Sequence, residues 1–502
     1  MTAPAPEWTR RAPVDLPGPE GDNSIAREPL WYAYGRGEDR PQPPAWTYAP
    51  TPPPDSHVPP PPPRPAGPSK TLPLGTTQRL SALPYPALPA PGGGPDALLH
   101  ALTTTFAPLR REPENPYNEH RPYASPRCLF PVHAFVGGDG GDWRLLEPDR
   151  HALTGPPSSA PTRIALTGRY TAIPPAYQWF RGSLVALELG MVLRALSLGL
   201  ELSGVPATLT LPDGNAPALL AEAGLDRTWE WSLPWLIETA GTPRRRSPAA
   251  PAEPPVPDSD PSLTDIVDVN RGQLYGSSAH PVTTAVPAGL PPSALTPDWA
   301  ELLWRRHSGR MPRGLHGMDS AARHAPLPAA TLRAVTAWLG VPPPHPALAA
   351  AFDAVTVTAV TQHIDGHATG VHRLRDGAAH LVRADRGAPA ALEAAYGYGL
   401  SPVNGCGVAK APLTVFFSVR PRDLFARLGP AGWGAAQHAC GWAVHGLCLA
   451  AAATGLFARP VRAFQEIPAK EVVALDEDET IVLSAVVGVP RETGGPVLDL
   501  RL

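Results

Sequence analysis

Two long apolar stretches, one in each half of the chain, decide the fold. Residues 183–200 read SLVALELGMVLRALSLGL, and residues 435–456 read AAQHACGWAVHGLCLAAAATGL. A helix that is apolar on nearly all sides must be buried on most of them. The first helix is expected to end at Gly199. Two such helices in one chain predict that each half buries a long helix, as two subunits do at the core of a dimer.

The same order of elements precedes each long helix, which indicates an internal duplication. A helical pattern is followed by an alternating strand and then by its hairpin partner. These stretches are 97–109, 131–138 and 141–153 in the first half, and 331–341, 354–362 and 367–382 in the second, which adds strands at 414–421 and 480–490. The sequence therefore predicts an α+β fold in which two similar domains form a pseudo-dimer within one chain.

Proline marks the segments outside these domains. The chain has 502 residues, of which 70 are proline. Proline-rich stretches are typically extended and poorly packed. We therefore expect an extended N-terminal arm at 1–75, a first domain at 76–242, a linker at 243–262 and a second domain at 263–502.

Charge and cysteine content restrict the partners and the compartment. The formal net charge of −3 provides no field that would recruit nucleic acid or an anionic membrane. The four cysteines form no CxxC pair, and the N-terminus lacks the apolar core of a signal peptide. No stretch is expected to span a membrane, so a reducing cytoplasm is the expected location.

The pentapeptide Arg306-His307-Ser308-Gly309-Arg310 is a candidate anion site. In an extended stretch, residues at i, i+2 and i+4 project to the same side, so Arg306, Ser308 and Arg310 converge. Two guanidinium groups that flank a hydroxyl suit a phosphate dianion, because charge-assisted arginine contacts are strong. A solvated basic turn is the alternative interpretation.

With this motif the chain resembles the nitroreductase-like flavoenzymes, most closely the azoline dehydrogenases of cyanobactin, streptolysin-type and thiopeptide biosynthesis. The resemblance covers most of residues 95–502. In this family FMN lies at a dimer interface, where one subunit gives an Arg-x-Ser-x-Arg phosphate motif. The other subunit gives a Pro-Ser-Ala-Gly-Ala-Leu-Tyr-Pro-like loop that lies against the isoalloxazine.

Here the two family motifs are split between the halves. The first half has the loop sequence ASPRCLFP at 124–131 but no Arg-x-Ser-x-Arg upstream of it. The second half has the phosphate motif, and its loop position at 346–353 reads PALAAAFD, without serine or glycine. The resemblance therefore implies two nitroreductase-like domains fused as a pseudo-dimer, with one complete FMN site and one dead site.

The resemblance also assigns the residues of the FMN site. It places the phosphate at Arg306, His307, Ser308 and Arg310, and the ring at Ser125, Pro126 and Arg127. Arg127 stands where glycine is usual, and either polarises the pyrimidine edge of the flavin or faces solvent. Arg491, after the last strand, either adds a phosphate contact or is a surface residue.

Azoline oxidation removes a proton and transfers a hydride to flavin, so a general base is needed near the substrate. Relatives commonly use a Lys-Tyr pair shortly before the long helix, and the nearest candidates here are Arg169, Tyr170 and Tyr177. A neighbouring arginine lowers the pKa of a tyrosine, although packing is the alternative role. Lys410, in a glycine-rich loop, either reaches flavin or substrate or lies on the surface.

His438, Cys440, His445 and Cys448 share the second long helix, with spacings that do not set out a tetrahedral metal site. We expect them to be buried core residues, and we expect no metal.

The expected activity is oxidation of thiazoline or oxazoline rings in a ribosomal peptide to thiazole or oxazole, with oxygen reoxidising FMN. The expected partners are the precursor peptide and a cyclodehydratase. An NAD(P)H-dependent reductase of nitro, quinone or ene substrates is one alternative, and a flavin-free scaffold subunit is the other.

Overall fold

A computed structural model gives the fold of this chain. It describes residues 61–94, 96–113, 119–138, 142–157, 160–239, 254–257, 260–309, 322–375, 377–396, 407–491 and 495–502. Most of the predicted N-terminal arm and linker, and Arg310 of the phosphate motif, lie outside the described residues.

An antiparallel sheet forms the centre of the first half. Its strands lie in the order β1-β6-β5-β4-β7-β9-β8-β10. They are β1 (Ser69–Thr71), β4 (Val132–Gly137), β5 (Trp143–Glu147), β6 (Ala152–Thr154), β7 (Arg163–Gly168), β8 (Ala207–Thr210), β9 (Trp235–Thr239) and β10 (His280–Pro281). The predicted hairpin of β4 with β5 is present.

The second half repeats this topology. Its strands are β11 (Ala322–Arg323), β12 (Thr356–Thr361), β13 (Gly370–Arg375), β14 (Ala378–Ala384), β15 (Leu413–Val419), β16 (Phe457–Val461) and β17 (Thr480–Pro490). The order β14-β13-β12-β15-β17-β16 matches β6-β5-β4-β7-β9-β8 strand for strand, and all of these pairings are antiparallel. Two halves with one strand order are what an internal duplication produces.

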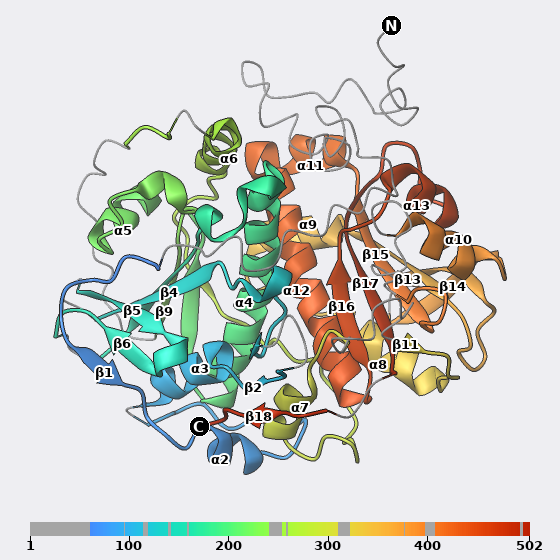
Figure 1. Ribbon diagram of the computed structural model, residues 1–502, viewed down its shortest axis with the longest axis horizontal. Coiled ribbons are helices and arrows are strands. Elements are labelled where there is room, and N and C mark those ends of the chain that lie inside the picture. Colours follow the sequence, from blue (N-terminus) through green and yellow to red (C-terminus); the bar gives the residue numbers. More distant parts are fainter. Residues whose placement is uncertain are drawn as a thin grey trace, which may run out of the picture.

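The two long helices lie side by side between the sheets (Figure 1). They are α4 (Phe180–Leu202) and α12 (Gly432–Ala453). They run in the same direction, because Gln437 contacts Ser183 near their starts and the carbonyl of Trp442 accepts from Arg194 further along. Every residue of α12 is buried, as its apolar sequence predicts.

Helix α4 continues past Gly199 to Leu202, which corrects the expected end. A Cβ atom on Gly199 would lie 2.7 Å from the carbonyl oxygen of Ala101 in α3 (Ala97–Phe106), so this glycine permits close helix packing. The chain leaves the helix at Gly204, whose φ of +65° is typical of a glycine that follows a helix.

By length and composition α4 could cross a membrane, contrary to the expectation that no stretch could do so. However, 94% of its most apolar window is buried inside the molecule, as in the core helix of a folded domain.

The remaining helices cover the sheets and the ends of the long pair, with α3 packed on α4 and α8 and α9 packed on α12. They are α2 (Thr76–Ser81), α5 (Ala216–Glu222), α6 (Pro261–Arg271), α7 (Trp299–Arg305), α8 (Ala329–Leu339), α9 (Pro346–Asp353), α10 (Ala388–Ala395), α11 (Pro421–Leu428) and α13 (Glu466–Val472).

The two halves are interlaced at their ends. At the C-terminus, β18 (Leu498–Asp499) pairs with β2 (Arg110–Arg111), which pairs with β3 (Glu119–His120) of the first half. Helix α6 packs on α4, and β10 joins the first sheet. Segments that follow residue 260 therefore complete the first half, and the proposed domain boundaries stay predictions.

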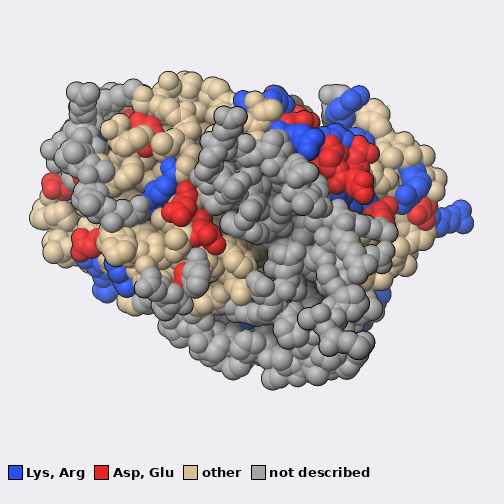
Figure 2. Space-filling view, turned by 90° about the horizontal axis from the view of Figure 1, so that it is seen from above, with Lys and Arg blue, Asp and Glu red and all other residues tan. Residues whose placement is uncertain are grey.

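Acidic and basic side chains lie next to each other on the described part of the face shown in Figure 2. Among the ion pairs of the described residues, Arg420 pairs with Asp476 and with Asp478, the latter at 3.0 Å. Exposed pairs of this kind contribute little to stability, so the fold depends on its buried core.

Candidate functional site

Arg306 joins the two halves of the chain at one place. It follows α7, and only 3% of it is exposed. Its Nη2 donates to the carbonyl oxygen of Arg121 in the first half, 2.8 Å away. Nη2 of Arg110 donates in turn to the carbonyl oxygen of Arg306, at 3.3 Å. The phosphate motif of the second half therefore lies against the segment that leads into the 124–131 loop of the first half.

Arg306 has a spare hydrogen-bond donor in a site rich in arginine. Arg110 pairs with Glu112 at 2.9 Å, and Arg121 pairs with Glu119 at 2.9 Å. The buried Nε of Arg306, in contrast, has no acceptor among the residues that the structure describes. Burial lowers the pKa of Arg306. Such a group is stabilised when an anion approaches it, because a charge-assisted hydrogen bond offsets the cost of desolvation.

The rest of the described phosphate motif is fixed along β16. The backbone N–H of Ala458 donates to the carbonyl of His307 at 3.2 Å. Arg459 Nε donates to the carbonyl of Ser308 at 2.7 Å, and its Nη2 donates to the carbonyl of Gly309 at 3.3 Å. The chain turns at the end of the described motif, because Ser308 lies in a bend and Gly309 has a φ of +83°, so the predicted convergence of Arg306, Ser308 and Arg310 stays a prediction.

The 124–131 loop of the first half holds an unusual backbone conformation. Arg127, Cys128 and Phe130 have φ values of +51°, +55° and +48°. Such values are costly for residues other than glycine and persist where the surroundings enforce them, often at functional sites. The glycine-like φ of Arg127 agrees with its place in the pattern, where glycine is usual in the family that the chain resembles.

A buried carboxyl group from α4 anchors this loop. Ser125 Oγ donates to Glu188 Oε2 at 2.5 Å and accepts from the backbone N–H of Phe130 at 2.8 Å. Glu188 Oε1 accepts from the backbone N–H of Val132 at 3.3 Å. Burial raises the pKa of Glu188 to about 8, because its hydrogen bonds only partly offset the loss of hydration.

Sequence reasoning missed Glu188, although a signal was present. It is a charged residue in the middle of the apolar stretch 183–200. Carboxyl groups are rarely buried unless they hold a partner. Arg194 is also a charged residue within this apolar stretch, so the sequence indicates a buried charge with a partner there as well.

The equivalent position in the second half is a regular helix. Residues 346–353, read from the sequence as a lost ring-binding loop, form α9. His345 caps this helix, because its Nδ1 accepts from the backbone N–H of Ala347 at 3.2 Å. The two halves therefore differ where one keeps the strained loop and the other has replaced it with a helix.

A second asymmetry lies between the long helices, where Arg194 and His445 hold equivalent places. Each stands four residues after the glycine at which α4 and α12 meet, Gly190 or Gly441. Arg194 donates to the carbonyl oxygens of Ala285, Trp338 and Trp442 at 2.9–3.2 Å.

Both ring nitrogens of His445, in contrast, are buried without a hydrogen-bond partner among the described residues. Burial and the neighbouring Arg194 and Arg306 hold the pKa of His445 well below its ordinary value, so the ring is neutral. Unpaired buried polar atoms are rare and indicate a missing partner. His445 and Arg306 therefore both carry unsatisfied buried nitrogens, and Trp338 in α8 and His345 before α9 each carry one as well.

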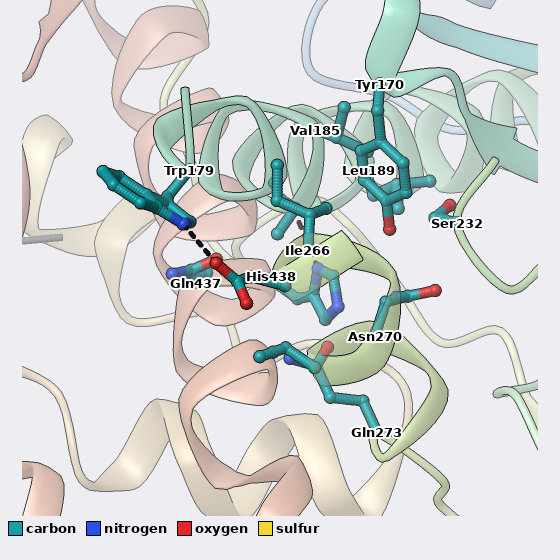
Figure 3. A pocket seen from close by; sticks show the side chains of 14 residues that line it. Tyr170, Trp179, Val185, Leu189, Ser232, Ile266, Asn270, Gln273, Gln437 and His438 are labelled. Carbon is teal, nitrogen blue, oxygen red and sulfur yellow. Dashed lines mark hydrogen bonds between the residues drawn. The ribbon is translucent and has the colours of Figure 1, made fainter. Parts of the chain in front are cut away.

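Of the catalytic candidates, Arg169 lies next to the 124–131 loop, because its backbone N–H donates to the carbonyl oxygen of Pro131 at 2.8 Å. The guanidinium of Arg169 pairs with Glu230 at 2.6 Å in a fully buried ion pair. Tyr170 is buried and lines a cavity beside the starts of the long helices (Figure 3). Tyr177 stacks on Phe180, with ring centroids 6.4 Å apart. Their proposed roles in catalysis stay predictions.

Lys410 and Arg491 lie in the second half. Lys410 is half-buried in a loop that Gln362 holds through the carbonyls of Val408, Ala409 and Ala411. Arg491 is exposed directly after β17. Pro126 is half-buried within the strained loop. The cysteines and histidines of α12 are buried, as expected, and burial raises the pKa of Cys448 to about 11.

No protein-family model matches the sequence, and no curated protein is significantly similar to it. The structure is similar to a chain from Anabaena variabilis described as a nitroreductase, with a TM-score of 0.59 and 13% identity. That similarity covers 85% of this chain and 92% of that chain, so both halves take part in it. The chain has a nitroreductase fold.

Two further similarities are local. A Desulfovibrio desulfuricans nitroreductase in complex with FMN has a TM-score of 0.24 at 16% identity, over 36% of this chain and 86% of that chain. A chain of the E. coli microcin synthetase complex has a TM-score of 0.29 at 15% identity, over 33% of this chain and 65% of that chain. Similarity at this level establishes neither the activity nor the ligand of this chain.

Proposed function

We propose that this protein is an FMN-dependent oxidoreductase with one flavin site per chain, at the contact between Arg306 and the 124–131 loop. One observation carries the proposal. Arg306, the first residue of one motif, donates a hydrogen bond to the carbonyl of Arg121, which lies three residues before the other motif and nearly two hundred residues upstream in the sequence. In the nitroreductase pattern these are the motifs that hold the phosphate and the ring of FMN.

The residues present fit this cofactor. The spare Nε of Arg306 would supply a donor for the phosphate, and the neutral ring of His445 would supply one further N–H donor. Ser125, Pro126 and Arg127 would hold the ring through the backbone of the strained loop, with Glu188 fixing that backbone. FMN, when bound, would supply hydride acceptance. The chain's own contribution is to position the cofactor and to keep water from the buried side.

A single site agrees with the asymmetry of the two halves. At the pseudo-equivalent side, Arg194 already satisfies three carbonyl groups, and α9 replaces the loop. Four of the five N–H donors of Arg194 are used on backbone carbonyls, so this guanidinium has little capacity left for a phosphate. This arrangement supports one flavin per chain rather than two.

The reaction we propose is the oxidation of thiazoline or oxazoline rings in a ribosomally made peptide. Each ring loses two hydrogens, one as hydride and one as a proton, and oxygen reoxidises the cofactor. Tyr170, Tyr177, Arg169 and Lys410 are the candidates for moving the proton, and a precursor peptide and a cyclodehydratase are the proposed partners. The choice of azoline oxidation over other flavin-dependent reactions rests on the sequence resemblance to azoline dehydrogenases.

The test uses the full chain as purified. Released flavin is identified by chromatography, and the protein is then incubated in air with a peptide that contains thiazoline. Mass spectrometry should show a loss of two hydrogens per ring, and the Arg306→Ala variant should show none.

Other outcomes separate the alternatives. If the protein binds FMN, causes no mass loss in the peptide and rapidly oxidises NAD(P)H, the protein is a reductase and not an azoline dehydrogenase. A properly folded protein that takes up no flavin would overturn the flavin site itself.

A further inference from the structure

A small cavity lies beside the starts of the two long helices, apart from the Arg306 site. Residues of α4, α6 and α12 enclose it, together with Tyr170 and Ser232 of the first half (Figure 3). Its volume is about 30 Å³. A water-sized group needs at least about 10–15 Å³, so the cavity admits a small head group and excludes an aromatic ring.

One wall of the cavity is a histidine with a fixed tautomer. His438 is 4% exposed, and its Nδ1 lies 2.8 Å from the carbonyl oxygen of Ala186. Since a carbonyl only accepts, Nδ1 carries the proton and Nε2 is left as an acceptor. The edge-on contact with Trp235, at 4.7 Å between ring centroids, holds the ring in place. Burial lowers the pKa of His438 to about 4, so the ring is neutral near pH 7.

The next residue of α12 supplies a second acceptor. Gln437 is 1% exposed, and its Nε2 donates to Ser183 Oγ at 3.1 Å. Its Oε1 accepts from none of the residues that the structure describes, and neither does Nε2 of His438. Two acceptors that border one cavity suit a ligand that donates hydrogen bonds.

Helix α6 contributes an acidic side chain to the cavity. Asp265 lines the cavity, and one of its oxygens accepts from Trp179 Nε1 at 2.6 Å. A carboxylate has about four acceptor positions, so one indole N–H leaves most of them available. Among the residues that the structure describes, those that line this cavity include no lysine and no arginine, although Arg271 donates to the lining residue Asn270 at 3.0 Å.

We propose that this cavity binds a primary ammonium group, R–NH₃⁺. Three donors on a water-sized cation match His438 Nε2, Gln437 Oε1 and the Asp265 carboxylate. The Asp265 carboxylate balances the charge of the ammonium group. An anion finds no positive partner here, and an amide offers fewer donors than the acceptors require.

Two chemical sources can present this group: a lysine side chain or the free N-terminus of a peptide. Either one would attach a peptide or partner protein to the pseudo-dimer at a place separate from the Arg306 contact. This inference does not depend on the proposed flavin, because neither Arg306 nor the 124–131 loop lines the cavity; Tyr170 lines it and is also a candidate for moving the proton in the proposed reaction.

The test is calorimetric titration of the full chain with three probes. Nα-acetyl-lysine N-methylamide presents the side-chain ammonium, and alanine N-methylamide presents the α-ammonium. Nα,Nε-diacetyl-lysine N-methylamide carries neither charge. At least one ammonium probe should bind, the diacetyl probe should not, and the preferred ammonium probe identifies the source.

Two aspartate variants locate the binding. Asp265→Asn keeps an acceptor for Trp179 but removes the charge, and it should weaken binding by about tenfold or more. Asp268→Asn removes the same charge from an exposed position of α6 and should change binding less than about twofold. Melting curves show whether both variants are folded.

The proposal is overturned if neither ammonium probe binds to the folded wild-type chain. It is also overturned if the diacetyl probe binds equally well, or if the two variants weaken binding to the same extent. A chain that binds an ammonium probe but no flavin would keep this inference and reject the flavin site, so the two failures are distinguishable.

Discussion

Gly190 of α4 and Gly441 of α12 face each other where the two long helices meet. A Cβ atom on Gly441 would lie 3.1 Å from the Cα of Gly190 and 2.0 Å from the carbonyl oxygen of Leu187. A Cβ atom on Gly190 would lie 2.0 Å from the carbonyl oxygen of His438. The pseudo-dimer therefore depends on backbone contact that larger residues would prevent.

Gly190→Ala should destabilise the protein, because backbone atoms must move to admit the methyl group. We expect a cost of about 2 kcal/mol or more. The control is Gly182→Ala in the same helix, whose new Cβ would meet Ile266 Cγ2, a movable side-chain atom, at 3.2 Å. Thermal melting should show a clear decrease for the first variant and little change for the second. Equal melting temperatures would contradict the close approach.

The repeated topology could be predicted from sequence because it depends on local periodicity. Strand β4 has a short alternating pattern, and β17 and α12 are recognisable as continuous apolar stretches of the length of a strand and of a long helix. The end of α4 could not be predicted from the sequence. Gly199 looks like a helix terminator, but it lies inside the helix and allows close packing against Ala101. The roles of Glu188 and Arg194 depend on partners far away in sequence, such as Ser125 and Trp338.

The pKa of Glu188 predicts a pH-dependent stability. Its pKa in the folded state, about 8, lies above the ordinary 4.5, so the folded state holds the proton more tightly. Between these values unfolding releases a proton, and the free energy of unfolding falls as pH rises, by up to about 1.4 kcal/mol per pH unit. Glu188→Gln cannot titrate and should remove this slope.

The measurement is a set of melting curves from pH 5 to pH 9. Wild type should lose stability toward pH 8 relative to Glu188→Gln. The control Glu301→Gln neutralises a half-buried carboxylate of α7 and should keep the wild-type slope. Parallel curves for wild type and Glu188→Gln would show that the buried carboxyl group does not titrate in this range.

Arg194→Met should destabilise the chain without creating a second flavin site. The substitution leaves the carbonyls of Ala285, Trp338 and Trp442 without their charged donor, a loss of about 3 kcal/mol or more. Arg333→Met, at an exposed position of α8, should change stability by less than about 0.5 kcal/mol. Flavin should remain at one per chain in both variants, measured by absorbance after denaturation. Two flavins per chain in Arg194→Met would contradict the role of α9.

His445→Leu separates a ligand contact from a packing role. Without flavin, removal of two unpaired nitrogens should leave stability unchanged or slightly higher. With FMN, the dissociation constant should rise about fivefold or more, because a hydrogen bond is lost. Flavin fluorescence titration measures it, and His438→Leu serves as the control because His438 borders the other cavity. Unchanged FMN affinity in His445→Leu would place the ligand elsewhere.

Flavin content tests the central claim most directly. The purified chain should release one FMN per chain. Arg306→Ala should weaken FMN binding by at least about tenfold, because a charge-assisted phosphate contact is lost. Arg305→Ala, at the neighbouring residue that pairs with Glu301 instead, should bind like wild type. A folded Arg306→Ala variant that retains its FMN, or a wild-type chain that binds none, would contradict the account.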